Sequence, residues 1–146
     1  MATWTFLAQL AATLYMTGLI WMVQVVHYPL FAKVGAEAFD EYHHLHMARI
    51  SPVVMVPMLV ELGAAALLLA HRPTWMPGWA ATAGVGLIAV AWGSTFIFSV
   101  PAHEALGRGL DAATVQRLVA TNWIRLAAWT ARSGLLLWLL ARALRP

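Results

Sequence analysis

The sequence contains no cysteine, and this absence removes several kinds of chemistry at once. Disulfides, thiolate metal sites, iron–sulfur clusters and cysteine nucleophiles are all excluded. Charge is scarce as well, because only 10% of the 146 residues are charged, against about 25% in soluble domains. The formal net charge of +3 is spread along the chain without a basic run, so we expect no nucleic-acid partner. So few charges cannot cover a water-exposed surface, and the chain is predicted to lie in a membrane.

Hydrophobic residues make up 62% of the chain and gather in four long segments. Each segment exceeds the ~20 residues that a helix needs to cross the hydrocarbon. A spanning backbone must satisfy its own hydrogen bonds, and the segments do not alternate as barrel strands do, so they are predicted to be helices. The segments cover approximately residues 4–31, 47–70, 78–100 and 118–144.

Short links between the segments predict one domain over residues 1–146, an all-α, up-down-up-down bundle of four transmembrane helices. The first segment lacks a basic start and is too long for a signal peptide, so we expect it in the mature protein. The link 32–42 is predicted to form a short amphipathic turn at the membrane interface. Asp111 is a good N-cap for the fourth helix.

The protein is expected to be a multi-pass protein of a bacterial inner membrane. The distribution of Lys and Arg residues does not decide its orientation.

Three polar residues in the spans predict specific partners, because an unpaired polar group in hydrocarbon costs several kcal/mol. Glu61 lies 14 residues past Met47, and Arg132 lies 14 residues past Leu118, so the two are predicted to share one depth and form an ion pair. This pair is equally compatible with a purely structural role. Arg125 has no second carboxylate in the spans to neutralise it, so its guanidinium is suited to an anionic or carbonyl-bearing ligand.

Five of the six histidines lie at or beside span ends that the topology brings to one side of the membrane, whereas His71 lies on the other. Histidine is the commonest protein metal ligand. Neutral imidazoles suit zinc, copper or iron, and a single haem could use two of them instead. Hydrogen-bonded or proton-handling histidines without a metal are the alternative interpretation. The candidate metal ligands are His27, His43, His46 and His103, with His44 as a bystander.

Two further features concern the first and fourth helices. Gly18 precedes the polar end of the first helix, and the run Asn122-Trp123-Ile124-Arg125 opens the fourth. In these features the chain resembles the anthrone-oxygenase-like family of small four-span membrane proteins. The resemblance implies oxygenation of polycyclic aromatic anthrones, with Asn122 and Arg125 as the shared functional positions. The dense histidine cluster departs from the family pattern.

The predicted function is a metal-dependent oxidoreductase or oxygenase that acts on a hydrophobic, membrane-soluble molecule. Asn122 and Arg125 would bind an oxygen of the substrate and stabilise developing negative charge, while Glu61 with Arg132 would fix the pocket and relay protons. The apolar walls are expected to include Trp92, Phe96, Trp123 and Trp129.

Two functions of other classes stay open. The first is non-enzymatic binding or transport of a metal ion, haem or a small anion. Transport through so thin a bundle would require a homo-oligomer, whose interface the glycines of the third helix could form. The second is a structural or assembly subunit whose polar residues only lock helix packing. The glycines in question are Gly84, Gly86 and Gly93.

Overall fold

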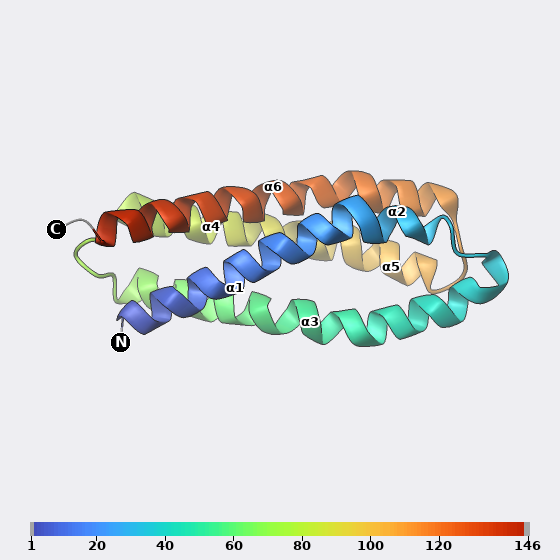
Figure 1. The fold of residues 1–146 in the computed structure, drawn as a ribbon, viewed down its shortest axis with the longest axis horizontal. Helices are drawn as coiled ribbons and strands as arrows, with labels where there is room; N and C mark the ends of the chain where they lie inside the picture. Colours follow the sequence, from blue (N-terminus) through green and yellow to red (C-terminus); the bar gives the residue numbers. More distant parts are fainter. Residues whose placement is uncertain (1, 145–146) are drawn as a thin grey trace.

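The computed structural model describes residues 2–144 of the predicted domain, and residues 1, 145 and 146 lie outside the described part (Figure 1). Its helices form four long rods that are joined by short links. Each rod is long and apolar enough to cross a membrane. The fold class is thereby confirmed, and the chain is a multi-pass membrane protein by length and composition of its helices. The elements are α1 (Ala2–Met22), η1 (Val23–His27), α2 (Tyr28–Phe31), α3 (Ala36–Ala70), α4 (Gly78–Ser94), η2 (Thr95–Ser99), α5 (Val100–Leu106) and α6 (Ala112–Ala143).

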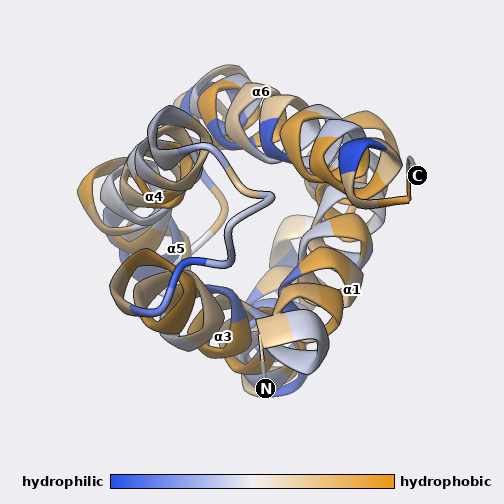
Figure 2. Ribbon diagram, turned by 90° about the vertical axis from the view of Figure 1, so that its left-hand side faces the viewer, coloured by the Kyte–Doolittle hydropathy of each residue, from blue (hydrophilic) through white to orange (hydrophobic). Residues whose placement is uncertain are grey.

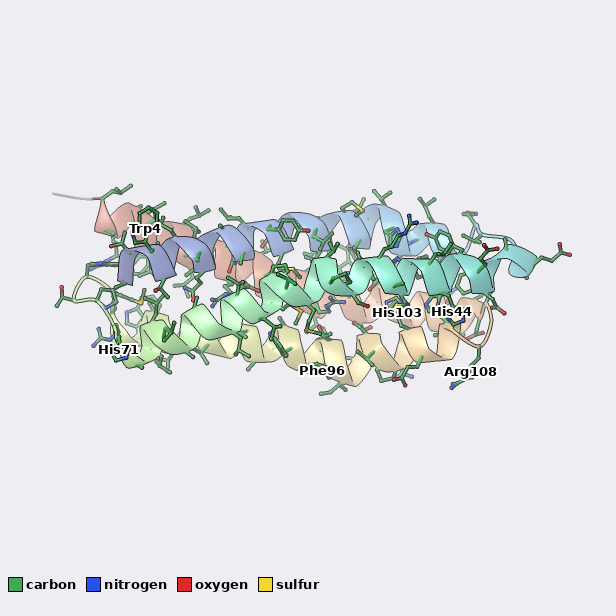
Figure 3. All side chains as sticks on the ribbon, turned by 90° about the horizontal axis from the view of Figure 1, so that it is seen from below. Trp4, His44, His71, Phe96, His103 and Arg108 are labelled. Carbon is green, nitrogen blue, oxygen red and sulfur yellow. The ribbon has the colours of Figure 1, made fainter. Side chains whose placement is uncertain are left out.

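The four rods form a ring in which each packs against two others (Figure 2). α1 packs between α3 and α6, and α4 closes the ring by packing against both α3 and α6. Successive rods run in opposite directions, so the links 32–35 and 107–111 meet at one end of the bundle (Figure 1). We call this the histidine end. The two chain ends and the link 71–77 lie at the opposite end, where His71 is found (Figure 3).

Two π-helical turns, η1 and η2, interrupt the first and third rods near the histidine end. Each turn precedes a proline, Pro29 or Pro101, which lacks an N–H and clashes with the carbonyl four residues earlier in a regular helix. The wider turn removes this conflict, and Tyr28 donates its backbone N–H to the Val23 carbonyl instead. The first rod therefore runs on to Phe31, where the predicted first span also ends.

The link 32–42 is not the interfacial turn that the sequence predicted, because α3 already begins at Ala36. Gly35 is extended, with φ −63° and ψ 145°, and starts the helix directly. Glu37 lies in the first turn, where a carboxylate interacts favourably with the helix dipole. Residues 36–42 therefore belong to the same rod as the histidines after them.

Asp111 is the N-cap of α6, as predicted. Its carboxylate accepts the Thr114 backbone N–H at 2.8 Å and also the Thr114 hydroxyl. These two hydrogen bonds to the charged form lower the pKa of Asp111 below its ordinary value. The helix accordingly starts at Ala112, six residues before the apolar stretch from which it was predicted.

Two hydrophobic clusters fill the interior, one toward each end of the bundle. The cluster near the histidine end includes Phe31, Leu118 and Trp129, and the other includes Phe6 and Leu136. Buried Glu61 and Arg132 lie between the two clusters, whereas buried Arg125 lies at the level of the cluster near the histidine end. The charged groups of the interior therefore lie at two levels.

Close helix contact, predicted at three glycines of the third span, is found at one of them. A Cβ added at Gly84 would lie 3.0 Å from the Arg132 Nη1 atom, whereas Gly86 and Gly93 have no atom within 4 Å of such a position. Arg132 Nη1 donates to the Gly84 carbonyl, so the missing side chain leaves room for the guanidinium. Gly84 is also buried inside the bundle, which removes it from the predicted oligomer interface.

Gly84→Val is expected to lower the free energy of unfolding by about 1–3 kcal/mol, because the added atoms meet a guanidinium that its partners hold in place. Gly86→Val is the matched control, since it makes the same change on the same helix at an exposed position. Unfolding of the detergent-solubilised variants measures the difference. Equal losses for the two variants would show that helix propensity, and not the contact with Arg132, sets the effect.

Candidate functional site

A cavity of about 500 Å³ lies inside the histidine half of the bundle. Its apolar wall comes from α1, η1, α3 and α5, and its polar part comes from α2, α3, η2, α5 and α6. The apolar wall includes Leu19, Ile20, Val23, Met47, Ile50, Val54, Met55 and Val100. The polar part includes Tyr28, His43, His46, Thr95, Ser99, His103 and Arg125. The volume falls within the range of small-molecule sites, about 300–1,000 Å³.

The cavity opens sideways between α3 and α5. Its rim includes Ser51 and Met55 on α3, which are exposed, and Glu104 on α5. His44, predicted as a bystander, is exposed and lies on the same rim, where Figure 3 shows it near His103. From His44 to Met55 the rim extends along α3 for about 16 Å, from the head-group side into the outer part of the hydrocarbon. A membrane-soluble molecule can therefore reach the cavity from one leaflet.

The four candidate histidines are brought together, as predicted, and they form two hydrogen-bonded pairs. His27 Nε2 lies 3.0 Å from His46 Nδ1, and His43 Nε2 lies 3.2 Å from His103 Nδ1. The ring centroids of His46 and His103 are 5.6 Å apart, so the two pairs are neighbours. His43 and His46 reach the cluster from one face of α3, as their spacing of three residues predicts.

Tyr28 extends one of these pairs into a chain of three groups. Its hydroxyl lies 3.1 Å from His103 Nε2, and the other ring nitrogen of His103 contacts His43. The far nitrogen of His43, Nδ1, faces Gly107 in the link at the histidine end. Each neutral imidazole has one donor and one acceptor, so the three groups can point their hydrogens along a single direction. The chain therefore extends from Tyr28 on the cavity toward the link at the histidine end.

Several buried polar atoms on the cavity lining have no hydrogen-bond partner among the described residues. They are His43 Nδ1, His46 Nε2 and Arg125 Nε. A buried donor or acceptor left without a partner costs about 1–3 kcal/mol. Four further atoms of this kind among the described residues, on Trp92, Ser94, Asn122 and Arg132, lie away from the cavity. Those of His46 and Arg125 are placed to contact a group from outside the chain.

Arg125 carries the positive charge of this polar end. Its Nη1 donates to the Ser99 hydroxyl at 3.1 Å, and its guanidinium lies 5.5 Å from the ring centroid of Trp129. Among residues 2–144 no carboxylate forms an ion pair with it, as the sequence predicted. The charge is nevertheless buried, with 4% of the residue exposed. An uncompensated buried guanidinium favours a ligand with an anionic or carbonyl oxygen.

The predicted ion pair between Glu61 and Arg132 is confirmed. Arg132 Nε lies 3.3 Å from Glu61 Oε1, and both residues are about 1% exposed. Glu61 also accepts hydrogen bonds from Trp129 Nε1 at 2.9 Å and from the Thr13 hydroxyl. Neither charged residue lines the main cavity. Their predicted role in fixing the interior has support from these contacts, whereas their catalytic role stays a prediction.

Asn122 lies behind the site and is fully buried. Its amide nitrogen donates to Gln24 Oε1 at 2.8 Å, and Gln24 in turn donates to the Val119 carbonyl. The residue does not line the cavity, so its predicted contact with a substrate oxygen stays a prediction. Gln24 is therefore bound to α6 at Asn122, one turn away from Arg125.

The aromatic walls predicted from the sequence are not those of the cavity. Trp129 is buried against Glu61 and Arg125, and Trp123 and Phe96 are about half exposed on the outer surface. Trp92 does not line the cavity either. Aliphatic and methionine side chains form the wall instead, because α1 and α3 turn those faces inward.

A metal centre with three or more protein ligands does not form in the part of the chain that the structure describes. No group of three His, Asp or Glu side chains there could hold a metal ion. The two histidine pairs do have nitrogen separations near the ~3.4 Å expected for two nitrogen ligands on one tetrahedral zinc ion. The predicted zinc, copper or iron ion, and the alternative haem, stay predictions.

No family model, curated protein or solved structure matches this chain. The resemblance to the anthrone-oxygenase-like proteins therefore stays a prediction, and the cavity must be interpreted from its own residues.

Tyr28 and Ser99 are the site residues that the sequence analysis missed. Both lie at a π-helical turn that precedes a proline, and π-turns are often found at functional sites. The available signal was the proline at the end of each long apolar span, since it predicts a local change of helical phase next to the polar residues.

Proposed function

We propose that this chain is an integral membrane oxidoreductase that acts on a hydrophobic small molecule carrying a phenolic or carbonyl oxygen. The buried, unpartnered atoms His46 Nε2 and Arg125 Nε, both on residues that line the cavity, support this proposal most strongly. They match a ligand with one oxygen-bearing end, while the remaining wall matches an apolar ring or chain.

The polar residues suggest separate tasks at the oxygen-bearing end of the ligand. Arg125 would bind the oxygen and stabilise negative charge on it, aided by the low dielectric of the bundle. His46 Nε2, which is buried and unpartnered, would accept the hydrogen of a phenol. The chain Tyr28–His103–His43 would carry a proton between the cavity and the aqueous edge. Loss of a phenolic proton prepares an electron-rich ring for oxidation, with dioxygen as the oxidant in an oxygenase.

A metal-dependent form of this function, and simple metal binding without turnover, are the second candidates. These candidates have support from the nitrogen separations within the two histidine pairs, which are near those of two ligands on one metal ion. Two imidazoles alone give an incomplete ligand set, so the ligand's own oxygen or Tyr28 would have to complete it.

Naphthol binding to the detergent-purified protein tests the proposal. We expect calorimetric titration to detect binding by the wild type and at least tenfold weaker binding by His46→Ala/His103→Ala. His71→Ala is the matched control at the opposite end and is expected to bind as the wild type does. Absence of naphthol binding by the wild type, or equal binding by all three proteins, would contradict the proposal.

The same preparations separate the enzymatic forms. Oxygen consumption with naphthol that depends on His46 and His103 is expected for an oxygenase. Elemental analysis and an absorption spectrum then distinguish the metal or haem form, which would show a stoichiometric metal or haem bands that the double variant loses. Binding without turnover would reassign the chain to a carrier of lipophilic molecules.

A further inference from the structure

A second cavity of about 420 Å³ lies between the first rod and α3, on the opposite side of α3 from the main cavity. It is an open groove on the outer surface of the bundle. Met22, Leu45, Ile50 and Val53 form its apolar part, and Tyr42, His27, His46 and Arg49 form its polar part. No carboxylate lines the groove.

Arg49 is the only charged residue of the groove with a permanent charge, and it is exposed. Its guanidinium forms no hydrogen bond or ion pair with any residue from 2 to 144. The α3 positions one helical turn away on either side are Leu45, His46, Pro52 and Val53, so no acidic neighbour is available on its own helix. α1, η1 and α2, which face α3 across the groove, contain no Asp or Glu at all. The positive charge is therefore free for an external anion.

The position of Arg49 along α3 places it at the membrane surface. From Arg49 to the end of the helix at Ala70 there are 21 residues, or about 32 Å, which matches a hydrocarbon thickness of about 30 Å. Glu61 is the only charged residue in that stretch, and it faces the interior. Arg49 therefore lies at the boundary between hydrocarbon and head groups, with the apolar residues Ile50 and Val53 beside it on the hydrocarbon side.

We propose that this groove binds an anionic glycerophospholipid. The Arg49 guanidinium holds the phosphate through paired N–H donors, and the Tyr42 hydroxyl supplies a further donor. An acyl chain lies against Met22, Ile50 and Val53. A net negative lipid is favoured over a zwitterionic one, because the groove offers a cation and no carboxylate to receive a head-group ammonium. This groove shares His46 and Ile50 with the lining of the proposed substrate cavity, but the lipid proposal does not depend on the function of that cavity.

Lipid titration of the purified full-length chain tests the proposal. The probes are short-chain phosphatidylglycerol, short-chain phosphatidylcholine and inorganic phosphate, and native mass spectrometry counts the bound molecules. We expect phosphatidylglycerol to bind at least tenfold more tightly than phosphatidylcholine and inorganic phosphate not to compete. Arg49→Gln should remove this preference with an unchanged thermal midpoint in the absence of lipid, because the side chain is exposed.

Arg117→Gln is the matched control. Arg117 is an exposed arginine near the histidine end, on α6, and it does not line the groove. It is expected to retain the preference for phosphatidylglycerol. Equal loss in the two variants would indicate nonspecific attraction by surface charge and overturn the proposal. Displacement of the lipid by inorganic phosphate, or equal affinity for both lipids in the wild type, would overturn it as well.

Discussion

Glu61→Leu will lower the free energy of unfolding by about 3–5 kcal/mol, the largest loss that we expect from a single substitution. Removing the carboxylate leaves the Arg132 charge buried with no counter-ion, at 1% exposure. Trp129 Nε1 and the Thr13 hydroxyl lose their shared acceptor at the same time. Removing one partner of a buried ion pair costs far more stability than the intact pair contributes. The loss therefore exceeds that from truncating an apolar side chain of similar size.

The double variant Glu61→Leu/Arg132→Met provides the control. Replacing both charges by apolar groups of similar volume is often neutral or stabilising, so most of the lost stability should return. Unfolding in mixed detergent micelles measures both variants. If the double variant is as unstable as Glu61→Leu alone, then loss of packing and not an unpaired charge explains the result. If the refolded double variant consumes oxygen with naphthol as the wild type does, then the catalytic role predicted for Glu61 and Arg132 is wrong.

The depth of the charged residues could be predicted from the sequence, because charged groups in hydrocarbon must pair with a partner at the same depth. Counting residues from the same end places Glu61 and Arg132 at one level, and the structure pairs them. Arg125 is expected to lack a carboxylate partner, and among the described residues it does. Counting works here because a helix rises by a constant 1.5 Å per residue and each charge in the membrane must find a partner.

The direction in which side chains point around the helix axis was harder to predict than their depth. The sequence predicts a regular helix throughout the first span, but η1 closes with a hydrogen bond over five residues and shifts the helical phase of α2. His27 consequently pairs with His46 beside the outer groove, and Tyr28 takes the buried position on the main cavity. The same effect at η2 brings Ser99 to Arg125. The lipid-facing and interior faces of a membrane helix are both apolar, so the sequence does not show which aromatic residues face the cavity. The prediction of the aromatic walls is wrong for this reason.

Arg125→Gln will weaken naphthol binding by about 10- to 100-fold, the second large effect that we expect. Arg125 is the only charged residue at the buried polar end of the cavity, and its Nε lacks a partner. A hydrogen bond to a charged group contributes about 1.5–3 kcal/mol, which corresponds to this loss of affinity. Glutamine keeps a hydrogen-bond donor but removes the positive charge, so the fold is expected to survive. Calorimetric titration of wild type and variant measures the change.

Naphthalene, which has the same rings without the oxygen, separates this electrostatic effect from a change in cavity shape. If Arg125 acts on the ligand oxygen, then Arg125→Gln should leave naphthalene affinity within about twofold of the wild type while naphthol affinity falls. A parallel loss for both ligands would mean that the substitution deforms the apolar wall. Unchanged naphthol affinity would mean that the ligand oxygen lies elsewhere, against the histidines. The comparison is decisive because the guanidinium can distinguish the two molecules only through the oxygen that one of them lacks.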